Sequence, residues 1–248
     1  MLKFLRIARR KLIDEGSLKK YLLYTLGEIL IVVIGIFIAV QLNNWNESRK
    51  EEKKARSYLA ELKDELLRDI KYLLEQDSLL SIYESSTNKA ILQLQRAKNI
   101  SDILIADSLF NYRWSDLIVN SGVYEEMLYT GNFYSLKNKV LQEMIANHYK
   151  DIEAKKYITR SVNTGLRELQ DSNLLHPYHF LKQMEIDQFN ALDTSWIGNP
   201  NASTFIALNF YYGRTQTRAN ILRRSHFSQI ITSSKNLIEQ IDKELGVE

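Results

Sequence analysis

The sequence predicts an all-α protein in which one N-terminal transmembrane helix continues into a long helix of an extramembrane helical bundle. Residues 21–42 form a run of 22 residues in which Glu28 is the only charged side chain. No glycine or proline occurs between residues 36 and 121, where leucine and isoleucine recur at steps of three and four. No segment alternates polar and apolar residues as a half-buried strand does.

The apolar run fits a transmembrane helix in its length and in its flanks. At about 1.5 Å per residue, a helix of this length crosses a hydrocarbon core roughly 30 Å thick. Tyr21 and Tyr24 open the run and Trp45 follows it, and these aromatic residues are typical of the membrane interface. A cleaved signal peptide would have a shorter apolar core and a small-residue cleavage site, so we expect an uncleaved signal-anchor.

Residues 1–20 are predicted to be a basic amphipathic stub in the cytoplasm. They hold seven lysine and arginine residues against two acidic ones, and five basic residues follow the apolar run closely. This bias in basic residues favours a cytoplasmic N-terminus. In a bacterium with two membranes, the protein would then lie in the inner membrane with its large domain in the periplasm. The stub is expected either to lie as a short helix on anionic lipid or to be a disordered basic tail.

Residues 43–248 are long enough for one domain with a core of its own. We predict that this extramembrane domain is a bundle of four long helices with shorter ones. The chain has no cysteine, which excludes disulfides and thiolate metal sites. Its net charge of +3 comes from the stub, so the domain itself is close to neutral. A near-neutral domain has no basic surface for nucleic acid, and we expect no nucleic-acid partner.

The long helix after the span is expected to reach about residue 97 and to bury a leucine-rich stripe within the bundle rather than in a coiled coil. The stripe comprises Leu59, Leu62, Leu66, Ile70 and Leu73. A second buried face is predicted to run from Leu136 through Val140, Met144 and Tyr149 to Ile152. A third is predicted to join Phe227, Ile230, Leu237, Ile241 and Leu245.

Glycine, proline and N-cap residues predict where these helices begin and end. A helix is expected to stop at Gly131, and Ser135 is expected to cap the next one. Both prolines of the chain, Pro177 and Pro200, lie within residues 176–200, which we therefore predict to be a loop.

Glu28 is the residue of the span that most needs an explanation, because a carboxylate in hydrocarbon is costly. It borders a row of mainly small residues, Gly27, Gly35 and Ala39, that lets two helices approach closely. Three roles remain open. Glu28 holds an oligomer together through a hydrogen bond, it lines a cation pathway formed by several copies, or it pairs with a basic group of another membrane protein.

The sequence offers little support for catalysis. His176 and His179 flank Pro177, but a metal site would need two further ligands from afar, such as His148 or Asp187, and a polar loop explains the pair better. No glycine-rich phosphate loop, nucleophile motif or zinc-protease motif occurs. We therefore predict no enzyme activity, no catalytic residue, no metal and no cofactor.

Two segments resemble a family of uncharacterised bacterial single-pass membrane proteins. The first segment contains Lys-Tyr-Leu-Leu-Tyr at 20–24, Gly-Glu at 27–28, Ile-Gly-Ile at 34–36 and Asn-Asn-Trp-Asn-Glu at 43–47. The second comprises residues 124–153. The resemblance implies a cytoplasmic stub, a single span and an external helical domain, and it implies no activity or catalytic residue.

The function predicted from these features is that of a non-enzymatic, membrane-anchored helical module for protein interaction or sensing. Its partners are expected to be the lipid bilayer and, through the transmembrane helix, either copies of itself or another membrane protein. The alternative is an oligomeric ion or proton pathway that uses Glu28.

Overall fold

The computed structural model describes residues 18–112, 116–183 and 193–247. The chain divides into two compact units, Met1–Ala55 and Arg56–Glu248. The longest helix, α2 (Leu18–Gln95), contributes to both. The described residues are helical without any strand, and a long apolar N-terminal helix is followed by a helical bundle, so the predicted fold class is confirmed.

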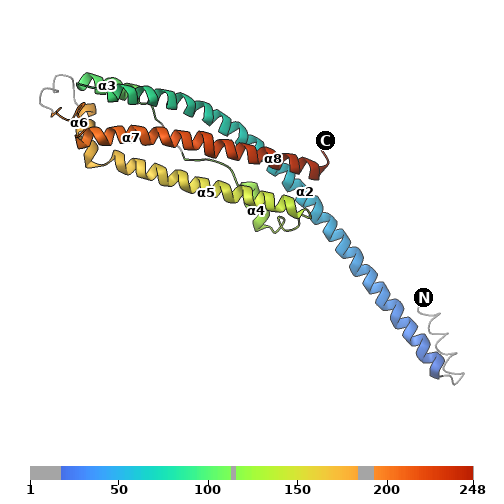
Figure 1. Ribbon diagram of the computed structural model, residues 1–248. Helices are drawn as coiled ribbons and strands as arrows, with labels where there is room; N and C mark the ends of the chain where they lie inside the picture. The colour runs from blue at the N-terminus through green and yellow to red at the C-terminus, as the bar shows by residue number, and fades with distance from the viewer. Residues whose placement is uncertain (1–17, 113–115, 184–192, 248) are drawn as a thin grey trace. The chain divides into compact units, whose positions relative to one another are not determined.

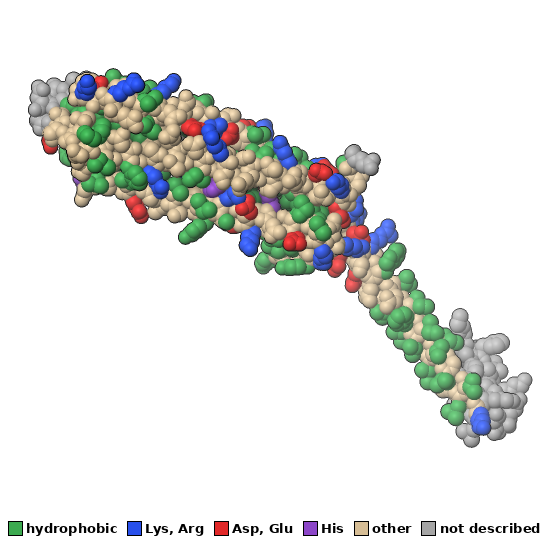
Figure 2. Space-filling model, viewed as in Figure 1, with side chains coloured by type: hydrophobic (Ala, Val, Ile, Leu, Met, Phe, Trp, Pro, Cys, Tyr) green, Lys and Arg blue, Asp and Glu red, His purple; other side chains and the backbone are tan. Residues whose placement is uncertain are grey.

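The first unit consists, in its described part, of the N-terminal half of α2. This helix begins at Leu18, so the last three residues of the predicted stub are already helical. The amphipathic segment predicted within residues 1–14 lies outside the described residues. The large apolar side chains from Leu22 to Leu42 are exposed, and Figure 2 shows green side chains along the helix with tan atoms between them.

The second unit is built on three long helical segments that run alongside one another (Figure 1). They are the remainder of α2, α5 (Lys139–Gln170), and a continuous helix made of α7 (Ser203–Asn220), a π-helical stretch η3 (Ile221–Phe227) and α8 (Ser228–Leu245). Helix α5 packs against both α7 and α8. The sequence predicted four long helices, whereas the described residues form three such segments.

Short elements connect these long segments. Helix α3 (Ile100–Leu109) follows α2, and α4 (Gly122–Tyr129) precedes α5. A single 3₁₀ turn, η1 (Asn173–Leu175), leads into α6 (His176–Gln183). Between α3 and α4 the chain is not helical in its described residues; we call residues 110–121 the strap.

The predicted leucine stripe of α2 is confirmed as the buried face of this helix. Its five residues are at most 9% exposed, and Leu62 is completely buried. The predicted face of α8 is confirmed at Phe227, Ile230, Leu237 and Ile241, which are buried, whereas Leu245 is only partly buried. Burial of a large apolar side chain contributes roughly 1.5–3 kcal/mol, so these two faces account for much of the stability of the bundle.

The predicted face along α5 is confirmed at Leu136, Tyr149 and Ile152, which are buried, but it is wrong near the start of the helix. Val140 is 69% exposed and Met144 is only partly buried, and the buried positions there are instead Leu141 and Ile145. The predicted cap is wrong as well, because Asn138 rather than Ser135 is the N-cap. The side-chain oxygen of Asn138 accepts a hydrogen bond from the backbone N–H of Leu141 at 3.0 Å.

The predicted stop after α4 is confirmed, since α4 ends at Tyr129 and Gly131 has a φ of 77°. The predicted loop over residues 176–200 is wrong at its beginning, because α6 occupies His176–Gln183. Pro177 stands at the second residue of α6, where a proline costs no helical hydrogen bond. Residues 184–192 of the predicted loop lie outside the described residues.

Gly198 holds the end of the loop before α7 against the end of α2. Its φ is 66°, and a Cβ at this position would lie 2.4 Å from the carbonyl oxygen of Ala97. Only glycine therefore allows this close approach. The contact helps to enclose the apolar core at this end of the bundle, to which Leu94, Trp196 and Tyr212 belong.

Candidate functional site

The predicted transmembrane site lies on the first unit. Glu28 is half-buried and lines a shallow groove of about 340 Å³ together with Thr25, Ile29, Val32 and Val33. These residues recur at helical steps of three and four, so a single face of α2 presents them. The carboxylate is therefore set into an apolar surface.

The small residues predicted as a helix-packing face are open in the structure. A Cβ added to Gly27 or Gly35 would meet no atom within 4 Å, and Ala39 is exposed. Ile31, which stands between them in the same row, is 72% exposed. Three of the four residues in this row are small, which lets the backbone of another helix approach closely beside Ile31.

Of the three predicted interface aromatics, only Trp45 has a described side chain. It is 64% exposed, and the guanidinium of Arg49 lies 5.8 Å from the centre of its ring. An aromatic ring beside a basic group is the pairing expected at the level of lipid headgroups. The side chains of Tyr21 and Tyr24 are outside the described residues.

The bundle contains buried polar groups that the sequence did not reveal. Glu65 and Asp69 of α2 are at most 6% exposed and point towards the strap and α4. Asp69 accepts hydrogen bonds from the backbone N–H of Asn120 at 3.0 Å and from its side-chain amide at 2.6 Å. Glu65 accepts from the hydroxyl of Tyr149 at 3.2 Å. Burial raises the pKa of Asp69, against the lowering effect of these hydrogen bonds.

Arg218 is the largest fully buried side chain, with 1% of its surface exposed. Its guanidinium lies 5.1 Å from the ring centre of Tyr112 in the strap, and its Nε donates to the side-chain oxygen of Asn163. Asn163 in turn donates to Asp116 at 2.8 Å. Burial lowers the pKa of Arg218 and raises that of Tyr112. These groups attach the strap to α5 and α7, and we assign them a structural role.

Two histidines lie in the interface between α5 and the η3–α8 helix. Nδ1 of His148 is 2.9 Å from the hydroxyl of Ser233, and Nδ1 of His226 is 3.2 Å from the hydroxyl of Thr159. Burial lowers the pKa of both, that of His148 to about 4. The sequence offers His148 as a distant metal ligand, but its ring lies in this interface and contacts Ser233.

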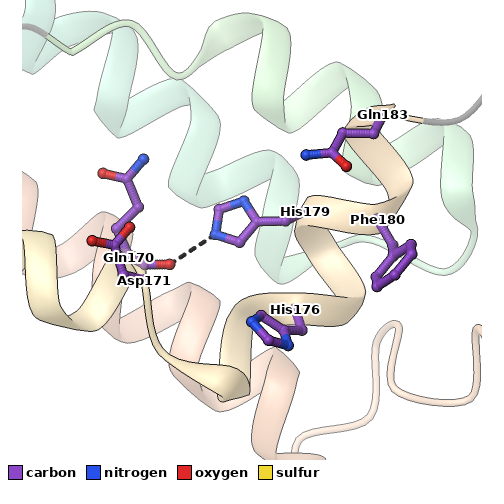
Figure 3. Close-up of a pocket in the computed structure, with 6 residues that line it drawn as sticks. All are labelled: Gln170, Asp171, His176, His179, Phe180 and Gln183. Carbon is purple, nitrogen blue, oxygen red and sulfur yellow. Dashed lines mark hydrogen bonds between the residues drawn. The ribbon is translucent and has the colours of Figure 1, made fainter.

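The predicted histidine pair lies at an open groove of about 480 Å³ where α5 ends and α6 begins (Figure 3). Gln170, Asp171, Phe180 and Gln183 complete its lining. The rings of His176 and His179 lie one below the other and do not meet, and Nε2 of His179 bonds the carbonyl oxygen of Gln170 at 2.8 Å. Within residues 18–112, 116–183 and 193–247, no group of three or more His, Cys, Asp or Glu side chains is placed to hold a metal ion.

Comparison with known proteins gives one match. The model of a family described as a family of unknown function (DUF6090) matches residues 28–176, which is more than half of the chain. No curated protein and no solved structure matches.

Proposed function

This chain belongs to the family of unknown function DUF6090, and we propose that it is a non-enzymatic, single-pass membrane module that assembles through α2 and uses its bundle for protein interaction or sensing. One helix among the described residues, α2, is long and apolar enough to cross a membrane. The bundle is a separate compact unit outside that apolar segment, and its surface is the part available for a partner or a ligand.

The observation that carries the proposal is the exposure of the apolar residues of α2. From Leu22 to Leu42, large apolar side chains are 48–75% exposed. Each would gain roughly 1.5–3 kcal/mol by leaving water, so together they favour transfer into lipid by tens of kcal/mol. A lipid bilayer supplies apolar surroundings on all sides, which a single partner protein does not.

Assembly through α2 is supported by the open strip at Gly27, Gly35 and Ala39. In lipid, helices associate by close packing and by hydrogen bonds rather than by the hydrophobic effect. A carboxyl group beside such a strip can hydrogen-bond across the helix pair. Glu28 occupies this position, so we propose that it stabilises the oligomer.

The orientation proposed is a cytoplasmic N-terminus, with the bundle on the other side of a bacterial inner membrane. The excess of basic residues before the apolar run supports it. Because the chain lacks cysteine, single cysteines report orientation without background. A membrane-impermeant maleimide applied to spheroplasts should label Ser101→Cys and not Ser17→Cys. Labelling of Ser17→Cys alone would reverse the orientation.

The test of anchoring and assembly uses the full-length protein. It should stay in the membrane pellet after alkaline carbonate extraction, and light scattering of the detergent complex should give a defined multimer after the detergent is subtracted. Release by carbonate would refute the anchor. A strict monomer would refute self-assembly and leave Glu28 to pair with another membrane protein.

The alternative role of Glu28 in an ion or proton pathway is distinguished by Glu28→Gln. The amide retains hydrogen bonding but removes the titratable charge, so the proposed module keeps its oligomeric mass. Purified wild-type protein in planar bilayers should show no current above an empty-bilayer control. A cation current that Glu28→Gln abolishes would favour the pathway instead.

A further inference from the structure

Residues 129–140, which we call the base turn, connect α4 to α5 at one end of the bundle (Figure 1). The second unit of the chain begins at this same end, at Arg56 of α2. Arg56 donates a hydrogen bond to the backbone carbonyl oxygen of Glu244 in α8 at 3.2 Å, and the carboxylate of Glu244 accepts one from Asn138 at 2.9 Å. The base turn therefore lies at the end of the bundle from which the chain leads to the apolar run.

The base turn exposes two tyrosine rings. Tyr129 is 95% exposed and Tyr134 is 68% exposed, whereas Phe133 between them is 6% exposed. The ring of Tyr134 stands edge-on to that of Phe133, with ring centres 5.6 Å apart. Tyrosine has an apolar body and a polar hydroxyl, so an exposed ring suits a surface where one end meets apolar groups and the other meets water.

Backbone hydrogen bonds give the base turn a defined shape. The N–H of Phe133 donates to the carbonyl oxygen of Met127 at 3.0 Å, and the N–H of Tyr134 donates to that of Gly131 at 3.1 Å. The φ of 77° at Gly131 lets the chain reverse here at no steric cost. The two tyrosine rings are therefore presented by an ordered turn.

The charge of this segment is positive. Residues 127–142 contain Lys137 and Lys139 and no acidic residue, and both lysine side chains are exposed. Glu126, the acidic residue that directly precedes the segment, accepts a hydrogen bond from Tyr58 at 2.8 Å. Tyrosine rings gather at the headgroup level of membranes, and lysines are attracted to anionic headgroups. The composition of the base turn therefore fits a lipid surface.

We propose that the base turn is a membrane-contact surface, in which Tyr129 and Tyr134 enter the headgroup layer while Lys137 and Lys139 meet anionic phospholipid headgroups. The proposal rests on the proposed membrane anchor, because the anchor keeps one bilayer within reach of the base turn. It goes beyond that anchor by giving the bundle a contact of its own with the bilayer. A second contact sets the tilt of the bundle on the membrane, which a single span leaves free.

The short connection to the apolar run favours lipid over a protein as the partner. Only residues 43–55 lie between that run and Arg56, and they belong to the helix α2. Their helical rise is about 20 Å, so the chain itself holds this end of the bundle close to the bilayer.

The proposal requires α2 to be tilted in the membrane. Transmembrane helices tilt by up to about 40°, and at that tilt a rise of about 20 Å leaves Arg56 about 15 Å from the hydrocarbon. A point about one helix diameter, about 11 Å, towards the membrane side lies about 7 Å lower. The base turn then lies about 8 Å from the hydrocarbon, at the edge of a headgroup layer about 5–8 Å thick.

Fluorescence quenching in lipid nanodiscs tests the contact with the full-length protein. Because the chain has no cysteine, a single cysteine carries a thiol-reactive fluorophore to one position. The discs contain neutral and anionic phospholipids, and a fraction of the headgroups carries a nitroxide quencher. Thr130→Cys reports on the base turn and leaves both tyrosines and both lysines in place.

Thr217→Cys is the matched control. Thr130 and Thr217 are both exposed, and each hydroxyl donates to the carbonyl oxygen four residues earlier, at 2.7 and 2.9 Å. Along the continuous α7–η3–α8 helix, Thr217 lies about 40 Å from the end of the bundle at which α8 stops. The fluorophore should be quenched at residue 130 and should stay bright at residue 217.

Trp45→Cys separates this proposal from the proposed anchor, because residue 45 directly follows the apolar run. Quenching at residue 45 without quenching at residue 130 would refute the contact and leave the anchor standing. Absence of quenching at residue 45 would refute the anchor, and the contact would fall with it. Equal quenching at residues 130 and 217 would show no preference for the base turn and would overturn the proposal. A fluorophore at residue 130 that is shielded from iodide in solution but not quenched by the lipid would point to a protein partner and overturn it as well.

Charge reversal tests the part assigned to the lysines. In the Thr130→Cys background, Lys137→Glu combined with Lys139→Glu should shift the equilibrium away from anionic discs by at least about tenfold, since each lysine near such a surface contributes a factor of about five. Glutamate is favourable at the start of a helix, so α5 should still form. Lys150→Glu, at an exposed site further along α5, is the control and should leave the quenching unchanged. Equal quenching in the double variant and in this control would overturn the assignment of anionic headgroups.

Removal of the rings tests the part assigned to the tyrosines. In the same background, Tyr129→Ser combined with Tyr134→Ser should reduce the quenching in neutral and in anionic discs, because both rings are then missing from the headgroup layer. Tyr157→Ser on α5, where the native ring is 74% exposed, is the control. Quenching that persists after both rings are removed would overturn the proposed insertion.

Discussion

The pH dependence of stability should reveal the buried state of His148. This ring is 6% exposed, and burial holds its pKa at about 4, below its usual value of 6.5. Asp151 acts to raise this pKa and Lys155 acts to lower it, but burial is the larger effect. The folded protein therefore keeps His148 neutral in a range of pH where the unfolded chain protonates it.

The sign of the effect follows from proton binding. Between pH 6.5 and about 4, the unfolded chain binds a proton at His148 that the folded bundle does not bind, so acid favours unfolding. The contribution to stability is complete above pH 6.5 and is lost as the pH falls to about 4. A difference of one pKa unit corresponds to about 1.4 kcal/mol, so the total loss is about 3 kcal/mol.

The experiment compares the wild type with His148→Asn. The asparagine amide can take the place of Nδ1 opposite Ser233, where the native contact is 2.9 Å, but it does not titrate. Urea unfolding of the full-length protein in detergent, followed by circular dichroism at pH 7 and pH 4, gives the free energy of unfolding of the bundle. The wild type should lose about 3 kcal/mol more than the variant between these pH values. Equal losses in the two proteins would refute the reasoning, because other titrating groups are common to both.

Three further predictions concern stability and assembly. Leu62→Ala should destabilise the bundle by about 2–5 kcal/mol in urea unfolding, because Leu62 is completely buried. Leu79→Ala, at a site that is 41% exposed, should cost under about 1 kcal/mol. Similar losses in the two variants would contradict the assigned core. Asp69→Ala should lower the free energy of unfolding by about 1–3 kcal/mol, because it leaves both N–H donors of Asn120 without their acceptor. Hydrogen exchange at the backbone amide of Asn120 should then accelerate. Unchanged exchange would count against this attachment of the strap. Gly35→Ile should reduce the oligomeric mass in detergent, because the added side chain separates the helices; an unchanged mass would place the contact on another face of α2.

The bundle features that sequence reasoning missed share a physical cause. Arg218 and Asn163 look like ordinary solvated helix residues in the sequence, and their burial depends on partners 55 residues apart in the chain. The same holds for Asp69, whose partner in the strap lies 51 residues away. No local pattern encodes such pairings, because a polar residue is buried only where the fold supplies a matching group.

The sequence by itself determined the features that depend on neighbouring residues. The apolar run, the uninterrupted helix after it and the leucine stripe ending at Leu73 follow from hydropathy, period and the absence of glycine and proline. The stop near Gly131 follows from the conformational freedom of glycine.

Tertiary structure decided the rest. It selected Asn138 over Ser135 as the cap of α5, and it buried Leu141 and Ile145 where the sequence predicted Val140. It also attached the strap through Asp69 and Arg218. These outcomes depend on which distant surfaces meet, and that is fixed by the packing of whole helices rather than by the preferences of single residues.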